Sequence, residues 1–143
     1  MTAETWDPWA YVEERHPDVQ VVVMALEGRL QGCVDLRRRI NWLADSLTPV
    51  QARCVLAFEI GRLQQGPKSD DPRVERAQKF AAQEWAALML VSSEDFVAAW
   101  ANCLDLSSMA ARCGVDVPMF RARWRAASDS DLDAWLEAVQ TPI

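Results

Sequence analysis

The chain has 143 residues, of which 50% are hydrophobic and 25% charged, a composition typical of a folded domain that excludes a largely disordered chain. Its formal net charge of −6 opposes general affinity for nucleic acids, because neutralising phosphates requires clustered lysines and arginines. Residues 1–7 lack the features of a signal peptide, and the longest apolar run, Trp85–Val91, is far shorter than the ~20 residues that span a bilayer. We therefore expect one cytoplasmic domain over residues 1–143, with no membrane segment.

The first predicted element is a short helix over residues 8–15. Asp7-Pro8 is typical of a helix start, with aspartate as the N-cap and proline in the first turn. His16-Pro17 ends the helix, because a residue before proline avoids the α region. Within this helix we expect Trp9 and Val12 to face the core.

A small sheet is expected next. The run Val19–Met24 is rich in β-branched residues and predicts a strand, and two further strands are predicted at Leu30–Val34 and Arg38–Leu43. Alternation in the last of these places Ile40 and Trp42 on its buried face. The sequence therefore predicts a three-stranded, mainly antiparallel sheet.

Everything after Ser46 is expected to be helical, which makes the fold α+β: a small sheet packed on a helical bundle. The expected helices are Thr48–Gln65, Pro72–Val91, Glu94–Asn102, two short helices around Gly114, and Asp129–Val139, so that the C-terminal helical part covers about residues 93–139. Helical spacing predicts that the second of these helices buries Val74, Ala77, Ala81, Trp85, Leu88 and Met89.

The helix Thr48–Gln65 carries the one pattern that points to specific chemistry. Phe58, Glu59 and Arg62 occupy the first, second and fifth positions of an H-E-x-x-H motif. In that motif two histidines one turn apart bind Zn²⁺, and the glutamate acts as general base toward the metal-bound water. A phenyl ring and a guanidinium cannot ligate zinc, so we expect neither a metal nor another cofactor here.

In order and spacing, these pieces resemble the ImmA/IrrE family of metallopeptidases, particularly the short forms of actinobacteria and their phages. The resemblance spans about residues 8–137, and its segments are His16–Val19, Leu26–Gly28, Arg39–Leu43, Ser46–Thr48, Arg53–Gly61, Trp85–Val91 and Ala110–Trp124. It implies a zincin-like core helix over Thr48–Gln65, with zinc ligands at the positions of Phe58 and Arg62. It also implies a third, acidic ligand about 20 residues further on, but residues 78–83 contain no acid.

The resemblance with all three ligands missing implies a degenerate, non-catalytic member, or pseudo-peptidase. The family is associated with cleaving or controlling repressors of phages and mobile elements. The implied partner is therefore a protein: a repressor, or another phage or host factor in immunity or repressor control. The oligomeric state stays open.

Two interpretations of the former metal site follow. In the simpler one, Glu59 is a vestigial residue, solvated or paired with an arginine, while Phe58 fills the vacated site and Arg62 pairs with Glu59 or a nearby acid. In the sharper one, the former cleft contains Phe58, Glu59, Arg62 and Gln83 and binds a peptide or protein, with Arg62 contacting a carboxylate.

Residues 107–125 leave an alternative function open. A helix, Gly114 and a second helix outline a helix-turn-helix, and the second helix offers Arg121, Arg123 and Arg125 to a nucleic acid. The same helix must also pack its apolar side chains, and acidic residues follow it directly. Packing is the simpler interpretation, and a small DNA-binding transcriptional regulator is the alternative.

Overall fold

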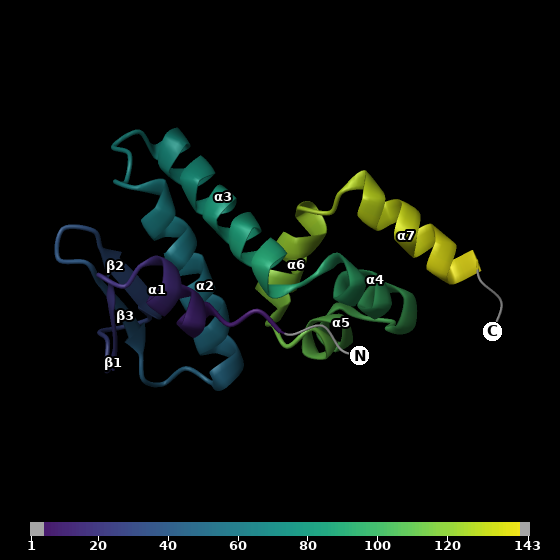
Figure 1. Ribbon diagram of the computed structural model, residues 1–143, viewed down its shortest axis with the longest axis horizontal. Coiled ribbons are helices and arrows are strands. Elements are labelled where there is room, and N and C mark those ends of the chain that lie inside the picture. Colours follow the sequence, from purple (N-terminus) through teal and green to yellow (C-terminus); the bar gives the residue numbers. More distant parts are fainter. Residues whose placement is uncertain (1–4, 141–143) are drawn as a thin grey trace.

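The computed structural model describes residues 5–140, which adopt an α+β fold with seven helices and a three-stranded sheet (Figure 1). The elements in chain order are α1 (Pro8–Arg15), β1 (Gln20–Met24), β2 (Gly32–Asp35), β3 (Ile40–Ala44), α2 (Pro49–Gln65), α3 (Pro72–Leu90), α4 (Ser93–Asn102), α5 (Leu106–Arg112), α6 (Val117–Arg125) and α7 (Asp129–Gln140). The predicted helices and strands are therefore confirmed, with small shifts at their ends. Within the described residues, no helix combines the length and apolar character needed to cross a membrane.

The sheet is mixed, so the prediction of a mainly antiparallel sheet is wrong. Its strand order is β1-β3-β2, with β1 parallel to β3 and β2 antiparallel to β3. A tight turn that includes Arg39 at a φ of 58° joins β2 to β3 and makes that pair antiparallel. Because β2 reverses the chain and occupies the far edge, β3 returns between the two strands in the direction of β1.

The predicted alternation in β3 is present, but its phase is wrong. Asn41 and Leu43 are buried, whereas Ile40 and Trp42 are only half-buried on the other face. Leu43 belongs to the apolar cluster that α2 forms with the sheet, and α2 packs against β2 and β3. The packing of α2 therefore decides which face of β3 is buried, and Asn41 lies on that face despite its polar side chain.

Helix α2 is shared by two apolar clusters. The sheet-side cluster has the buried members Val12, Val19, Leu43, Leu56, Ile60 and Leu63, and the bundle-side cluster is built around Cys54, Ala57, Phe96, Phe120 and further residues of α3 to α6. Val12 faces the core as predicted, but Trp9 on the same helix is exposed.

The buried face of α3 also differs from the prediction. Val74, Ala77, Ala81 and Leu88 are exposed, Trp85 and Met89 are half-buried, and the buried residues are Ala82, Ala86, Ala87 and Leu90. Helix α3 packs against α2 and α6, and small side chains on this face allow close approach. A Cβ atom added at Gly61 of α2 would lie 2.9 Å from the carbonyl oxygen of Ala82.

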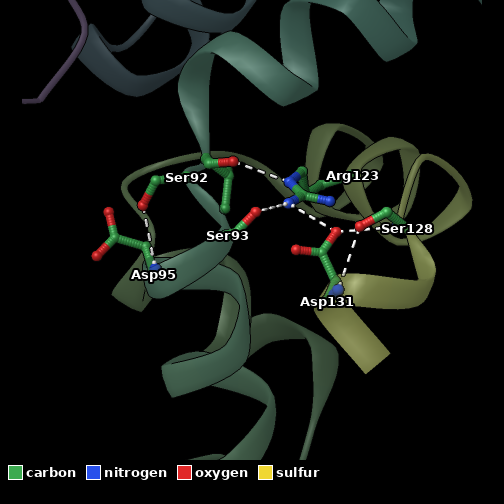
Figure 2. Close-up of polar contacts among 7 residues, drawn as sticks. Ser92, Ser93, Asp95, Arg123, Ser128 and Asp131 are labelled. Atoms are coloured by element: carbon green, nitrogen blue, oxygen red, sulfur yellow. Dashed lines mark hydrogen bonds and ion pairs between the residues drawn. The ribbon is translucent and has the colours of Figure 1, made fainter. Parts of the chain in front are cut away.

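Arg123, which the sequence offered as a DNA contact, is instead buried in an ion pair (Figure 2). Its Nη2 lies 3.1 Å from Oδ2 of Asp131 at the start of α7, and its Nε donates to the carbonyl oxygen of Val91, 2.8 Å away. Asp131 also accepts from the backbone N–H of Ser128 at 2.9 Å. The pair therefore joins α6 to α7 and to the junction of α3 and α4.

We expect Arg123→Ala to lower the free energy of unfolding by about 3–5 kcal/mol, because it leaves Asp131 charged and buried without its partner. The double variant Arg123→Met/Asp131→Leu removes both charges, and its free energy of unfolding should fall clearly less. Urea unfolding checks both variants, with Arg121→Ala on the exposed side of α6 as the control, expected within about 0.5 kcal/mol of the unsubstituted protein. Equal losses in the single and double variants would contradict the role of the ion pair.

Candidate functional site

A cleft of about 760 Å³ opens between α2, α3, the segment that leads into β2, and the start of α6. We call this the α2–α3 cleft. Its lining residues are Arg29, Leu30, Gln31, Gly32, Gln51, Cys54, Val55, Phe58, Glu59, Arg76, Lys79, Phe80, Gln83, Asp116, Pro118 and Met119. Three of the four residues that the sequence assigned to a former active-site cleft are therefore brought together: Phe58, Glu59 and Gln83.

Arg62 is not among the lining residues, so it must be removed from the predicted set. Its Nη2 lies 3.2 Å from Oε1 of Glu75 on α3, and both side chains are largely buried. Lys79 lies 3.6 Å from the same carboxylate oxygen. The prediction that Arg62 pairs with a nearby acid is confirmed, and the acid is Glu75 rather than Glu59. An arginine held in this way does not offer a carboxylate contact to a ligand in the cleft.

Glu59 is not paired with an arginine, which was one form of the simpler interpretation, and it lines the α2–α3 cleft. Its side chain is buried, and among residues 5–140 it makes no hydrogen bond or ion pair. Burial raises its pKa to about 7, while the positive charge of Arg62 acts in the opposite direction. Near neutral pH the carboxyl group is therefore close to equally divided between its charged and neutral forms. In the neutral form it can donate a hydrogen bond, and in the charged form it can only accept.

Phe58 lines the α2–α3 cleft without filling it. The ring is half-buried, and the cleft beside it keeps its volume of about 760 Å³. Across the cleft, Phe80 of α3 is about half exposed. Two aromatic rings on facing helices therefore give the cleft apolar walls.

The cations in or beside the cleft come from three separate segments. Arg29 precedes β2, and Arg76 and Lys79 lie on α3. Arg125 at the end of α6 does not line the cleft, but it contacts the lining residue Phe80, with its Cζ 5.6 Å from the ring centroid. The Nη2 of Arg125 also donates to Oε1 of Gln83 at 3.1 Å. Sequence reasoning missed these walls because they meet only in the folded chain.

One signal for the β2 wall was present in the sequence. A glycine inside a predicted strand often marks a close approach of the backbone to another element. A Cβ atom added at Gly32 would lie 2.7 Å from Cγ1 of Val55 and 3.1 Å from the carbonyl oxygen of Trp42. Gly32 therefore allows β2 to lie close against α2, which brings the segment before it to the edge of the cleft.

The three arginines of the predicted helix-turn-helix do not form one surface. Arg121 is exposed, Arg123 is buried against Asp131, and Arg125 contacts Gln83 and Phe80 at the α2–α3 cleft. A recognition helix requires neighbouring side chains that reach base edges together. The arrangement here instead uses two of the three arginines for contacts within the fold.

Comparison of the sequence with models of known protein families and with curated proteins gave no match. Within residues 5–140, no group of three or more His, Cys, Asp or Glu side chains lies close enough together to hold a metal ion. The site is therefore described by its own geometry: an open cleft with aromatic walls, cations at its edges and one buried carboxyl group.

The raised pKa of Glu59 predicts how stability depends on pH. The native state holds this proton up to about pH 7, whereas an unfolded chain loses it near pH 4.5, so stability falls as pH rises between those values. Glu59→Gln keeps the size of the side chain without the charge. We expect the free energy of unfolding of the variant to equal that of the unsubstituted protein at pH 4. At pH 8 it should be higher by up to roughly 3 kcal/mol.

The measurement is urea unfolding of both proteins across this pH range, and the decisive quantity is the difference between them at each pH. The matched control is Glu13→Gln, at an exposed position of α1, for which we expect no comparable pH-dependent gain. A difference at residue 59 that stays constant from pH 4 to 8 would show that folding does not raise the pKa of this carboxyl group.

Proposed function

We propose that the protein is a non-catalytic, ImmA/IrrE-like pseudo-peptidase that binds a protein partner in its α2–α3 cleft. The proposed partner is a repressor, or another phage or host factor that controls mobile elements in the cytoplasm. The observation that carries this proposal is the open cleft beside Phe58-Glu59. The resemblance implies that the family holds its metal at these positions. The zincin-like nature of α2 is part of the same proposal.

The side chains at the former ligand positions support a function other than zinc chemistry. Phe58 has no donor atom, and Arg62 places a positive charge where a second ligand would approach a cation. Its partner Glu75 is already engaged by Arg62 and Lys79. A lone glutamate beside them does not acidify a water molecule that no metal binds.

The shape of the cleft supports binding of an extended segment. Its volume of about 760 Å³ falls within the range of pockets that enclose a ligand. Gly32 at the start of β2 and Gln31 just before it form part of the cleft wall, and β2 pairs with β3 on one side only. An edge strand with free N–H and C=O groups can accept a further strand, while side-chain pockets supply selectivity.

The first test replaces Phe80 with a photo-crosslinking phenylalanine analogue in the native host. We expect a discrete protein partner to be crosslinked from this position, because the side chain lies in the wall of the cleft and is half exposed. The control places the analogue at Leu104, which is fully exposed and does not line the cleft, and should not capture the same partner.

The captured partner then tests the absence of catalysis. We expect the purified protein to carry no stoichiometric zinc by elemental analysis and to leave the partner uncleaved with or without added Zn²⁺. Cleavage that EDTA abolishes, or one zinc ion per chain, would refute a pseudo-peptidase. Capture of the same partner from Phe80 and Leu104 alike would refute the α2–α3 cleft as its binding site.

A further inference from the structure

The charge of the α2–α3 cleft is opposite in sign to that of the whole protein. The chain carries a formal net charge of −6, yet Arg29, Arg76 and Lys79 line this cleft. Among residues 5–140, Arg29 and Arg76 are exposed and have no ion-pair partner. Two cations left without partners in an acidic protein provide attraction for a ligand with negative charges.

The carboxylates of the cleft do little to offset these cations. Asp116 accepts a hydrogen bond from the backbone N–H of Met119, 2.9 Å away, as the N-cap of α6. Glu59 is buried, and burial raises its pKa to about 7, which favours the neutral form relative to an exposed glutamate. The groups that face Glu59 are Arg62 on its own helix and Cys33 on β2, whose pKa is raised by burial and by the charges of Glu59 and Asp35. The positive charge at the edges of the cleft therefore dominates.

Apolar side chains share the same surface as the cations. Leu30 and Phe80 are each about half exposed, and Phe58 is half-buried between them in the cleft wall. Aromatic rings that remain exposed in a cleft act as anchors for apolar side chains of a partner. An occupant that matches this surface must therefore carry both acidic and apolar groups.

A peptide fits these features better than a nucleic acid does. A polynucleotide presents an unbroken row of phosphates, which would have to lie beside Glu59 and Asp116. Arg121, the exposed arginine of α6, does not line the cleft and would not extend a phosphate-binding track from it. In an extended peptide, side chains alternate in direction, so acidic groups can reach the cations while apolar groups enter the cleft.

We propose that the α2–α3 cleft binds an acidic, extended segment of its protein partner, with carboxylates at Arg29 and Arg76 and apolar side chains at Phe58 and Phe80. This inference rests on the proposed function and adds the chemical class of the ligand to it. The partner segment would lie beside the free edge of β2, with its charges directed toward α3 and the segment before β2.

The test uses two labelled peptides and fluorescence anisotropy. One alternates glutamate with leucine, and its twin has lysine in place of every glutamate. We expect the acidic peptide to bind at least about tenfold more tightly than its twin, and to bind more weakly as salt is raised, because charged groups at the edge of an interface are screened. Equal binding of the two peptides, or no binding of either, would overturn the inference without requiring any variant to fold.

The variant Arg29→Glu/Arg76→Glu locates the binding site. We expect it to weaken binding of the acidic peptide by about tenfold or more, because it reverses two cations at the cleft. The control Arg37→Glu/Arg38→Glu makes the same change in net charge in the turn between β2 and β3, outside the lining of the cleft, and should bind as the unsubstituted protein does. If both variants bind the acidic peptide equally weakly, the effect is explained by net charge alone, and the inference is overturned.

Two further outcomes separate this inference from the proposed function. If a single-stranded oligonucleotide displaces the acidic peptide at equal concentration, the cleft recognises phosphates and the peptide inference fails. If the partner crosslinked at Phe80 binds the Arg29→Glu/Arg76→Glu variant unchanged, the proposed function stands and the inference about charge fails. If no partner is crosslinked at Phe80, the proposed function itself fails.

Discussion

The contact between Gly61 and Ala82 fixes the geometry on which the rest of the structure depends. A side chain at residue 61 would meet the backbone of α3 at 2.9 Å, so only glycine allows α2 and α3 to lie this close. Helix α2 forms part of both apolar clusters, and α3 packs against α6 on its other side. Close packing of α2 on α3 therefore connects the sheet to the helical bundle, and the same two helices contribute walls to the α2–α3 cleft.

The residues of α2 on either side of that contact take different roles. Arg62, the next residue toward the C-terminal end of α2, reaches Glu75 and forms a largely buried ion pair across the two helices. Toward the other end, Phe58 faces the open side, where α3 contributes Phe80 and Gln83. Helices α2 and α3 are therefore joined by an ion pair at Arg62 and separated by the cleft at Phe58. Glu59 lies on α2 between these two residues and is buried without a hydrogen-bond or ion-pair partner among the described residues.

Most elements could be predicted because their signals are local. Asp7 caps α1 beside Pro8, as the sequence indicated. In the structure Thr48 and Gln51 form a capping box at the start of α2, and Asp71 caps α3 beside Pro72, which are equally local features. The direction of the strands could not be predicted because it depends on the position of β3 between β1 and β2. Which residues of β3 are buried could not be predicted because that depends on the face that α2 covers. The buried ion pair of Arg123 was missed for a related reason: an arginine on a short helix is usually exposed, and its partner Asp131 belongs to the next helix. The cleft was predicted in part, through the residues of α2 and Gln83, whereas the cations and the β2 wall come from distant segments.

The buried carboxyl group of Glu59 is the strongest reason to regard the cleft as functional rather than as a remnant. Taking an unpaired carboxylate out of water opposes folding, and a glutamine of the same size would not incur that electrostatic cost. The sequence also places Phe58 beside it, yet the ring leaves the cleft open where a larger apolar cluster could have closed it. A group that opposes stability, in an open cleft bordered by unpaired cations, is the arrangement expected when recognition of a ligand outweighs the stability of the empty fold. Helix α2 thus forms one wall of an open cleft whose edges carry cations and whose walls carry aromatic rings.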